Sequence, residues 1–146
     1  MMRCVDVMCV ASGLLLLEGC ADGLEPLYGD MSVDSVLEID PEGDLSFGEV
    51  STERSEVRAL TLYAVGDTVL TIQRVSFDEN TSAAYTLLPL DLPLGIPPNE
   101  SVDIEIRFSP DYVGTFNGHV EIFDGGRDTT RRLIGFGCDP SAAGCN

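Results

Sequence analysis

The sequence predicts an all-β fold, a sandwich of two antiparallel sheets with about seven short strands. Residues 102–109 alternate apolar and polar side chains over eight positions, which is the period of a strand with one buried face. Turn signals rich in Gly, Pro, Asn and Asp recur between such segments. No long stretch has the 3.6-residue period of an amphipathic helix, so helical and α/β folds are not expected.

The other strands are predicted in order from Val36, where sustained alternation begins. Residues 116–122 repeat the clear alternation, and Gly118 falls on the inner face, where we expect a strand of the opposite sheet to approach closely. Less regular apolar segments complete the set: residues 36–50, 60–62, 69–77, 85–88 and 133–136.

Composition excludes several classes of function. The 146 residues carry 8 basic and 25 acidic side chains, a formal net charge of −17. That balance argues against binding to nucleic acid and against docking on anionic lipid through basic patches. The hydrophobic content of 44% is too high for a disordered acidic chain.

No catalytic, metal or cofactor site is predicted. His119 is the only histidine, and its place on the outer face of a strand indicates a solvated side chain rather than a catalytic base. One histidine with two cysteines is too few for a zinc site. Asp40, Glu42 and Asp44 alternate like the start of a calcium loop, but Leu45 and Ser51 stand where an EF-hand needs Gly and Glu.

The N-terminus predicts export. Residues 7–17 form an apolar run that follows Arg3, and a run of this length is too short to span a bilayer, which takes roughly 20 residues. We therefore assign residues 1–19 to a signal peptide.

The end of this run, Leu17-Glu18-Gly19-Cys20, resembles a bacterial lipobox, although Glu18 stands where a small residue is usual. The resemblance implies cleavage before Cys20, lipidation of its thiol and a tether over residues 20–35. Ala21 after the anchor resembles the pattern of lipoproteins sent to the outer membrane. Release into the periplasm or outside the cell, without a lipid, is the alternative.

Export also bears on the cysteines. If Cys20 carries lipid, Cys138 and Cys145 remain as an even pair in an oxidising compartment. Six intervening residues, with Pro140 and Gly144 among them, allow the chain to turn back, so we predict a disulfide. A crosslink to another chain, two free thiols, or pairing with an unlipidated Cys20 are the alternatives.

Five motifs in order resemble the ASH (hydin-like) immunoglobulin-like domains, including the bacterial choice-of-anchor D type. They are residues 45–50 (LSFGEV), 66–72 (GDTVLTI), 97–110 (PPNESVDIEIRFSP), 114–122 (GTFNGHVEI) and 133–137 (LIGFG). The resemblance implies an immunoglobulin-like domain over residues 36–138, followed by a tail over residues 139–146. It also implies a binding or spacer role without catalytic residues.

Taken together, these features predict a lipid-anchored, extracytoplasmic module of the cell envelope with a structural or protein-binding role. The expected contacts are the membrane, through the lipid, and an unidentified protein partner, with no nucleic acid. A secreted or surface adhesion module that depends on carbohydrate or Ca²⁺ is the alternative. The sequence leaves the oligomeric state open.

Overall fold

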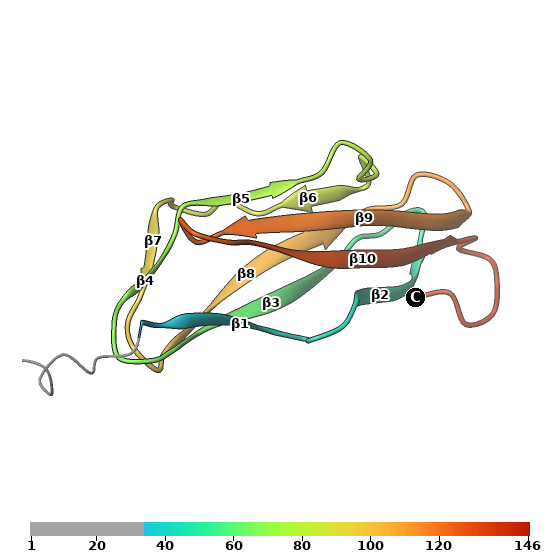
Figure 1. Ribbon diagram of the computed structural model, residues 1–146. Coiled ribbons are helices and arrows are strands. Elements are labelled where there is room, and N and C mark those ends of the chain that lie inside the picture. Colours follow the sequence, from blue (N-terminus) through green and yellow to red (C-terminus); the bar gives the residue numbers. More distant parts are fainter. Residues whose placement is uncertain (1–33) are drawn as a thin grey trace, which may run out of the picture. The chain divides into compact units, whose positions relative to one another are not determined.

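The segment with the clearest alternation forms strand β8 (Ser101–Phe108) in the interior of one sheet. The computed structural model describes residues 34–146, which form one compact unit (Figure 1). Within those residues all regular structure is β, and no helix is long and apolar enough to cross a membrane. The domain is an immunoglobulin-like β-sandwich, as the sequence predicts.

In the described residues, ten strands build two four-stranded sheets and a small ribbon. The first sheet has the order β1 (Val36–Asp40), β3 (Glu56–Val65), β8, β6 (Tyr85–Leu87), and every pair is antiparallel. The second sheet has the order β2 (Leu45–Ser51), β10 (Asp128–Cys138), β9 (Gly114–Phe123), β5 (Arg74–Phe77), with β2 parallel to β10. Strands β4 (Leu70–Ile72) and β7 (Leu94–Ile96) pair as the ribbon.

The core lies between the two sheets and contains the inward side chains of the alternating strands. At its centre four aromatic rings pack together, with Phe108 between the others at centroid distances of 5.0 to 5.5 Å. The hydroxyl of Tyr85 donates a hydrogen bond of 2.9 Å to the carbonyl of Phe116. Burial raises the pKa of the Tyr85 phenol above its ordinary value. The four rings belong to Phe47, Tyr85, Phe108 and Phe116.

Two segments that the sequence presents as single strands are each divided between two sheets. Residues 36–50 form β1 in the first sheet, a turn that begins at Pro41, and then β2 in the second sheet. Residues 69–77 form β4 and β5, which separate at Gln73 and join different partners. With β7 in addition, these divisions raise the number of strands from the predicted seven or so to ten in residues 34–146.

The structure explains why glycine occupies two positions of the family-like motifs, 48 and 118. Gly48 has a φ of +70° at a bulge in β2, where the register against β10 shifts between Ile134 and Gly135; such a backbone conformation favours glycine. Gly118 is buried, but the close neighbour is Thr81 of the β5–β6 loop. The expected approach of a strand from the opposite sheet at Gly118 is therefore wrong.

Contacts of the domain extend slightly beyond its predicted N-terminal limit. Ser35, the last residue of the predicted tether, donates its backbone N–H to the hydroxyl of Thr68 at 3.1 Å. The backbone N–H of Thr68 in turn donates to the hydroxyl of Ser35 at 3.1 Å. These bonds connect the entry to β1 with the turn between β3 and β4.

Candidate functional site

The two cysteines of the tail are joined. Cys138 ends β10, and its disulfide to Cys145 has a Cα–Cα separation of 5.7 Å, within the range that disulfides usually show. The structure therefore contains the bridge that the sequence predicts. Cys20, the predicted lipid anchor, lies outside the described residues.

The bridged tail folds back on the edge of the second sheet. The backbone N–H of Ser51, the last residue of β2, donates to the carbonyl of Asn146 at 2.7 Å. Within the tail, the hydroxyl and backbone N–H of Ser141 donate to the carboxylate of Asp139 at 2.6 and 2.8 Å. These hydrogen bonds lower the pKa of Asp139.

Reduction of this disulfide is expected to loosen the tail and to leave the core largely intact. A loop this short removes less than about 3 kcal/mol of unfolded-state entropy, and the bridge connects only the tail to the end of β10. The melting temperature should fall by no more than about 3 °C, whereas proteases should cut residues 139–146 faster.

Mass mapping of the non-reduced chain tests the bridge, since the C-terminal peptide must lack two hydrogens. Thermal scans and limited proteolysis with and without reductant, with the Cys138→Ser/Cys145→Ser variant as control, test its effect. A fall in melting temperature of more than about 8 °C would show that the bridge supports the core and would contradict this prediction.

The crossing of the chain from β1 to β2 leaves two strands half unpaired on one side. In the first sheet, β1 pairs with residues 61–65 of β3, so residues 56–60 have no neighbour on that side from the described part of the chain. In the second sheet, β2 pairs with β10 from Leu133 onward, so residues 128–132 likewise have no strand neighbour there among residues 34–146. A hollow lies beside each of these two unpaired strand segments.

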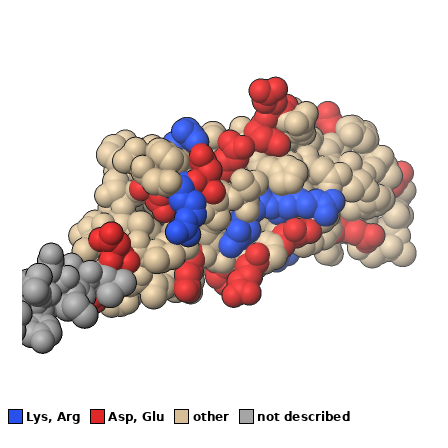
Figure 2. Space-filling view, viewed as in Figure 1, with Lys and Arg blue, Asp and Glu red and all other residues tan. Residues whose placement is uncertain are grey.

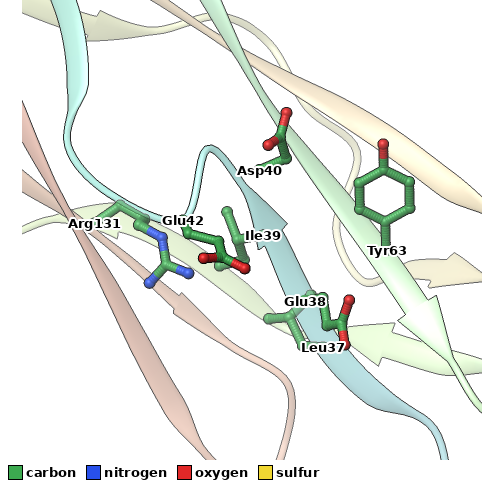
Figure 3. Close-up of a pocket in the computed structure, with 7 residues that line it drawn as sticks. All are labelled: Leu37, Glu38, Ile39, Asp40, Glu42, Tyr63 and Arg131. Carbon is green, nitrogen blue, oxygen red and sulfur yellow. The ribbon is translucent and has the colours of Figure 1, made fainter.

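The larger hollow, here called the β1 hollow, has a volume of about 620 Å³ and follows β1 (Figure 3). Four consecutive residues of β1 contribute to it, with Tyr63 from β3 on one side and Arg131 from β10 on the other. Its lining consists of Leu37, Glu38, Ile39, Asp40, Glu42, Tyr63 and Arg131.

Three carboxylates and one guanidinium line the β1 hollow. The Nε atom of Arg131 donates to the carbonyl of Pro41 at 3.2 Å, and Nη1 donates to the carbonyl of Thr130 at 3.1 Å. Among residues 34–146, the carboxylates of Glu38, Asp40 and Glu42 make no ion pair. The hollow therefore presents unpaired negative charge around an apolar floor of Leu37 and Ile39.

The second hollow lies against the unpaired half of β3 and is smaller, about 250 Å³. Glu56 and Arg58 line it and pair with each other at 3.3 Å. Asn146 also lines it and accepts the hydrogen bond from Ser51. The tail thus occupies part of this side of the sandwich, whereas the free side of β1 has no such cover from the described chain.

Two arginines of the second sheet, Arg74 and Arg132, form ion pairs with acidic side chains. Figure 2 shows arginine side chains across the middle of one face, with acidic side chains on both sides of them. Arg74 contacts Asp128 at 2.8 Å and lies 5.0 Å from the ring centroid of Phe123, and Arg132 lies 3.5 Å from Asp44. Exposed pairs of this kind contribute at most about 1 kcal/mol each.

The candidates for catalysis and for calcium do not assemble into sites. His119 is partly exposed, and its Nδ1 lies 3.4 Å from a carboxylate oxygen of Asp78. Asp40 lies at the end of β1, while Asp44 faces Arg132. In the part of the chain that the structure describes, no group of three or more His, Cys, Asp or Glu side chains could hold a metal ion.

Sequence reasoning did not find the β1 hollow. The alternation of β1 could be read, but the contact of Arg131 with Pro41 joins residues 90 positions apart and follows from the crossing of the chain between sheets. The one signal in the sequence is the cluster of turn residues at 40–44, whose alternating acids resemble the start of a calcium loop.

Comparison with known proteins addresses the fold. No protein-family model matches the chain, and no curated protein matches it. Among solved structures, PapD-like domain 7 of human CEP192, an ASH/PapD-like domain, matches with a TM-score of 0.54 and 17% identity over 74% of this chain and 89% of that domain. The fold is ASH/PapD-like.

Two bacterial structures are also similar to this chain. A Porphyromonas gingivalis protein of unknown function matches with a TM-score of 0.58 and 16% identity, over 70% of this chain and 46% of its own. The Vibrio cholerae VesB protease matches with a TM-score of 0.53 and 12% identity, over 77% of this chain and 35% of its own. At such identities the likeness concerns the fold alone. The ASH/PapD-like fold agrees with the resemblance that the sequence motifs carry.

Proposed function

We propose that this chain is a non-catalytic, lipid-anchored, extracytoplasmic module that binds a protein partner. The observation that carries the proposal is the open edge of β1 with the hollow beside it, because an edge strand offers backbone groups that another chain can pair with. The ASH/PapD-like fold supports it as a binding scaffold.

The N-terminal sequence supports the anchor. The apolar run of residues 7–17 has signal-peptide length and is followed by Cys20 in a lipobox-like context, and Ala21 favours the outer membrane as destination. One acyl chain binds a membrane only marginally, whereas several chains on one residue hold a protein stably. A lipid on Cys20 would keep the domain at a membrane surface in the cell envelope.

Replacement of Cys20 tests the anchor. Cys20→Ser should move the protein from the membrane fraction to the soluble fraction and remove the acyl mass from its N-terminal peptide. Cys9→Ser, which changes a cysteine inside the predicted signal peptide, should leave both unchanged. A wild-type chain that is soluble and carries no lipid by mass spectrometry would disprove the anchor.

Site-specific crosslinking in intact cells tests the protein-binding role. A photoreactive phenylalanine analogue would replace either Tyr63, which lines the β1 hollow, or Tyr112, which is exposed elsewhere. We expect a discrete adduct from position 63 and none from position 112. No adduct from either position would contradict protein binding. An adduct from position 112 alone would keep protein binding and remove the β1 hollow as its site.

A further inference from the structure

We propose that the free edge of β1 accepts an extended, basic segment of the partner as an added strand of the first sheet. The segment would carry Lys or Arg at alternate positions and apolar residues between them. This inference rests on the proposed protein-binding function and specifies the chemistry of the partner at the same site.

The backbone of β1 provides the docking edge. Within residues 34–146, β1 is the terminal strand of its sheet and pairs with β3 alone, through residues 61–65. In an antiparallel ladder, alternate residues direct their N–H and C=O groups away from the paired strand. A partner segment that lies along β1 would satisfy these groups and extend the sheet by one strand.

The side chains of β1 determine which segment fits. Leu37 and Ile39 are buried on the inner face, while Glu38 and Asp40 are exposed on the outer face. Side chains of directly opposed residues on neighbouring strands lie about 4.5–5.5 Å apart at Cβ. Outward positions of the added strand would therefore meet Glu38 and Asp40, and its inward positions would extend the apolar layer of Leu37 and Ile39.

The charge of the hollow favours a basic segment. The carboxylates of Glu38, Asp40 and Glu42 have no ion-pair partner in the described chain. Arg131, the cation of the lining, donates its side-chain hydrogen bonds to the backbone carbonyls of Pro41 and Thr130. Lys or Arg at the outward positions of a partner segment would supply the missing positive charge.

The same charges disfavour a second copy of this chain as the occupant. If two β1 strands paired antiparallel about their central residue, Glu38 of one copy would oppose Glu38 of the other. Like charges in direct opposition destabilise a strand pair, and each copy carries a formal net charge of −17. A basic segment from a different protein avoids both penalties.

Binding of synthetic peptides to the purified full-length chain tests the proposal. The probe is a fluorescently labelled peptide of seven residues with Lys and Val in alternation, measured by fluorescence anisotropy. Three peptides of the same length serve as controls: one with Glu in place of Lys, one with the same residues in two blocks, and one methylated on every backbone nitrogen. We expect each control to bind at least tenfold more weakly than the probe.

A matched pair of variants locates the site. Glu38→Lys should weaken binding of the probe about tenfold, whereas Glu105→Lys should change it less than threefold. Both residues are exposed glutamates on the outer face of the first sheet, but Glu105 lies on the interior strand β8. Raising the NaCl concentration to 0.5 M should weaken binding because added salt screens exposed charges.

Hydrogen exchange of the bound chain provides a readout that charge alone would not give. Strand addition should slow exchange in a peptide covering residues 36–40, with little change in one covering β8. Equal binding of the alternating and blocked peptides, or no slowing at β1, would overturn strand addition. Absence of probe binding would do the same, and an adduct at position 63 in cells would then still support protein binding.

Discussion

Ile104→Asp is expected to cost about 5 kcal/mol or more of folding free energy, enough to unfold a domain of ordinary stability. Ile104 is 1% exposed on interior strand β8 and lies opposite Leu60, which is fully buried. A carboxylate at this position would lose its hydration and find no partner. Urea denaturation of the full-length chain, followed by circular dichroism, measures the loss.

Two further variants make the result interpretable if Ile104→Asp does not fold. Ile104→Val should cost about 0.5–1.5 kcal/mol. Glu105→Lys, on the exposed neighbouring residue, should change stability by no more than about 0.5 kcal/mol. Similar losses from Ile104→Asp and Glu105→Lys would contradict the assignment of the two faces of β8.

The cost of Ile104→Asp should also depend on pH. Burial raises the pKa of an introduced carboxyl above its unfolded value of about 4. The unfolded state then releases the proton first, so the variant loses stability as pH rises above that value. We therefore expect a smaller destabilisation near pH 4 than at pH 7, each measured relative to the wild type at the same pH.

Strands with regular alternation could be predicted from the sequence because a single physical condition, one buried face, governs them. Strand β8 has inward Ile104, Ile106 and Phe108 and outward Asp103 and Glu105, as its period of two predicts. The order of the family-like motifs added the immunoglobulin-like topology. The prediction succeeds for a strand such as β8, whose whole alternating segment lies in one sheet.

The transfer of a strand from one sheet to the other could not be predicted in this way. Apolar alternation continues on both sides of the turn at residues 41–44, so β1 and β2 give the same local pattern as one interrupted strand. What separates them is their pairing with β3 and β10, which are distant in the sequence. The β1 hollow results from that separation and was therefore also missed.

The closing motif can be recognised in the sequence as a pattern, but only the structure shows why glycine occupies positions 135 and 137. A Cβ on Gly137 would lie 2.2 Å from the backbone carbonyl oxygen of Tyr112, and one on Gly135 would lie 2.6 Å from the ring of Phe108. The two glycines of the motif therefore allow β10 to approach residues 108–112 closely. These approaches allow a prediction that couples two positions.

Gly135→Ala should destabilise the domain by about 3 kcal/mol, because the added methyl group overlaps the ring of Phe108. That ring is fully buried and packs against Phe47, Tyr85 and Phe116, with centroids 5.0 to 5.5 Å away, so it has little room to move. Gly43→Ala is the matched control, since a Cβ at Gly43 would meet nothing within 4 Å, and it should cost less than about 0.5 kcal/mol.

A double-mutant cycle with Phe108→Leu isolates the contact. Phe108→Leu alone should cost about 2 kcal/mol through lost packing, but it removes the ring atoms that the new methyl group would meet. In that background the cost of Gly135→Ala should fall to about 1 kcal/mol or less, a coupling of about 2 kcal/mol between the two positions. The cycle is calculated from the free energies of unfolding of the four proteins, each measured by denaturant titration. Equal costs of Gly135→Ala in both backgrounds would show that the ring of Phe108 is not what excludes a side chain at Gly135.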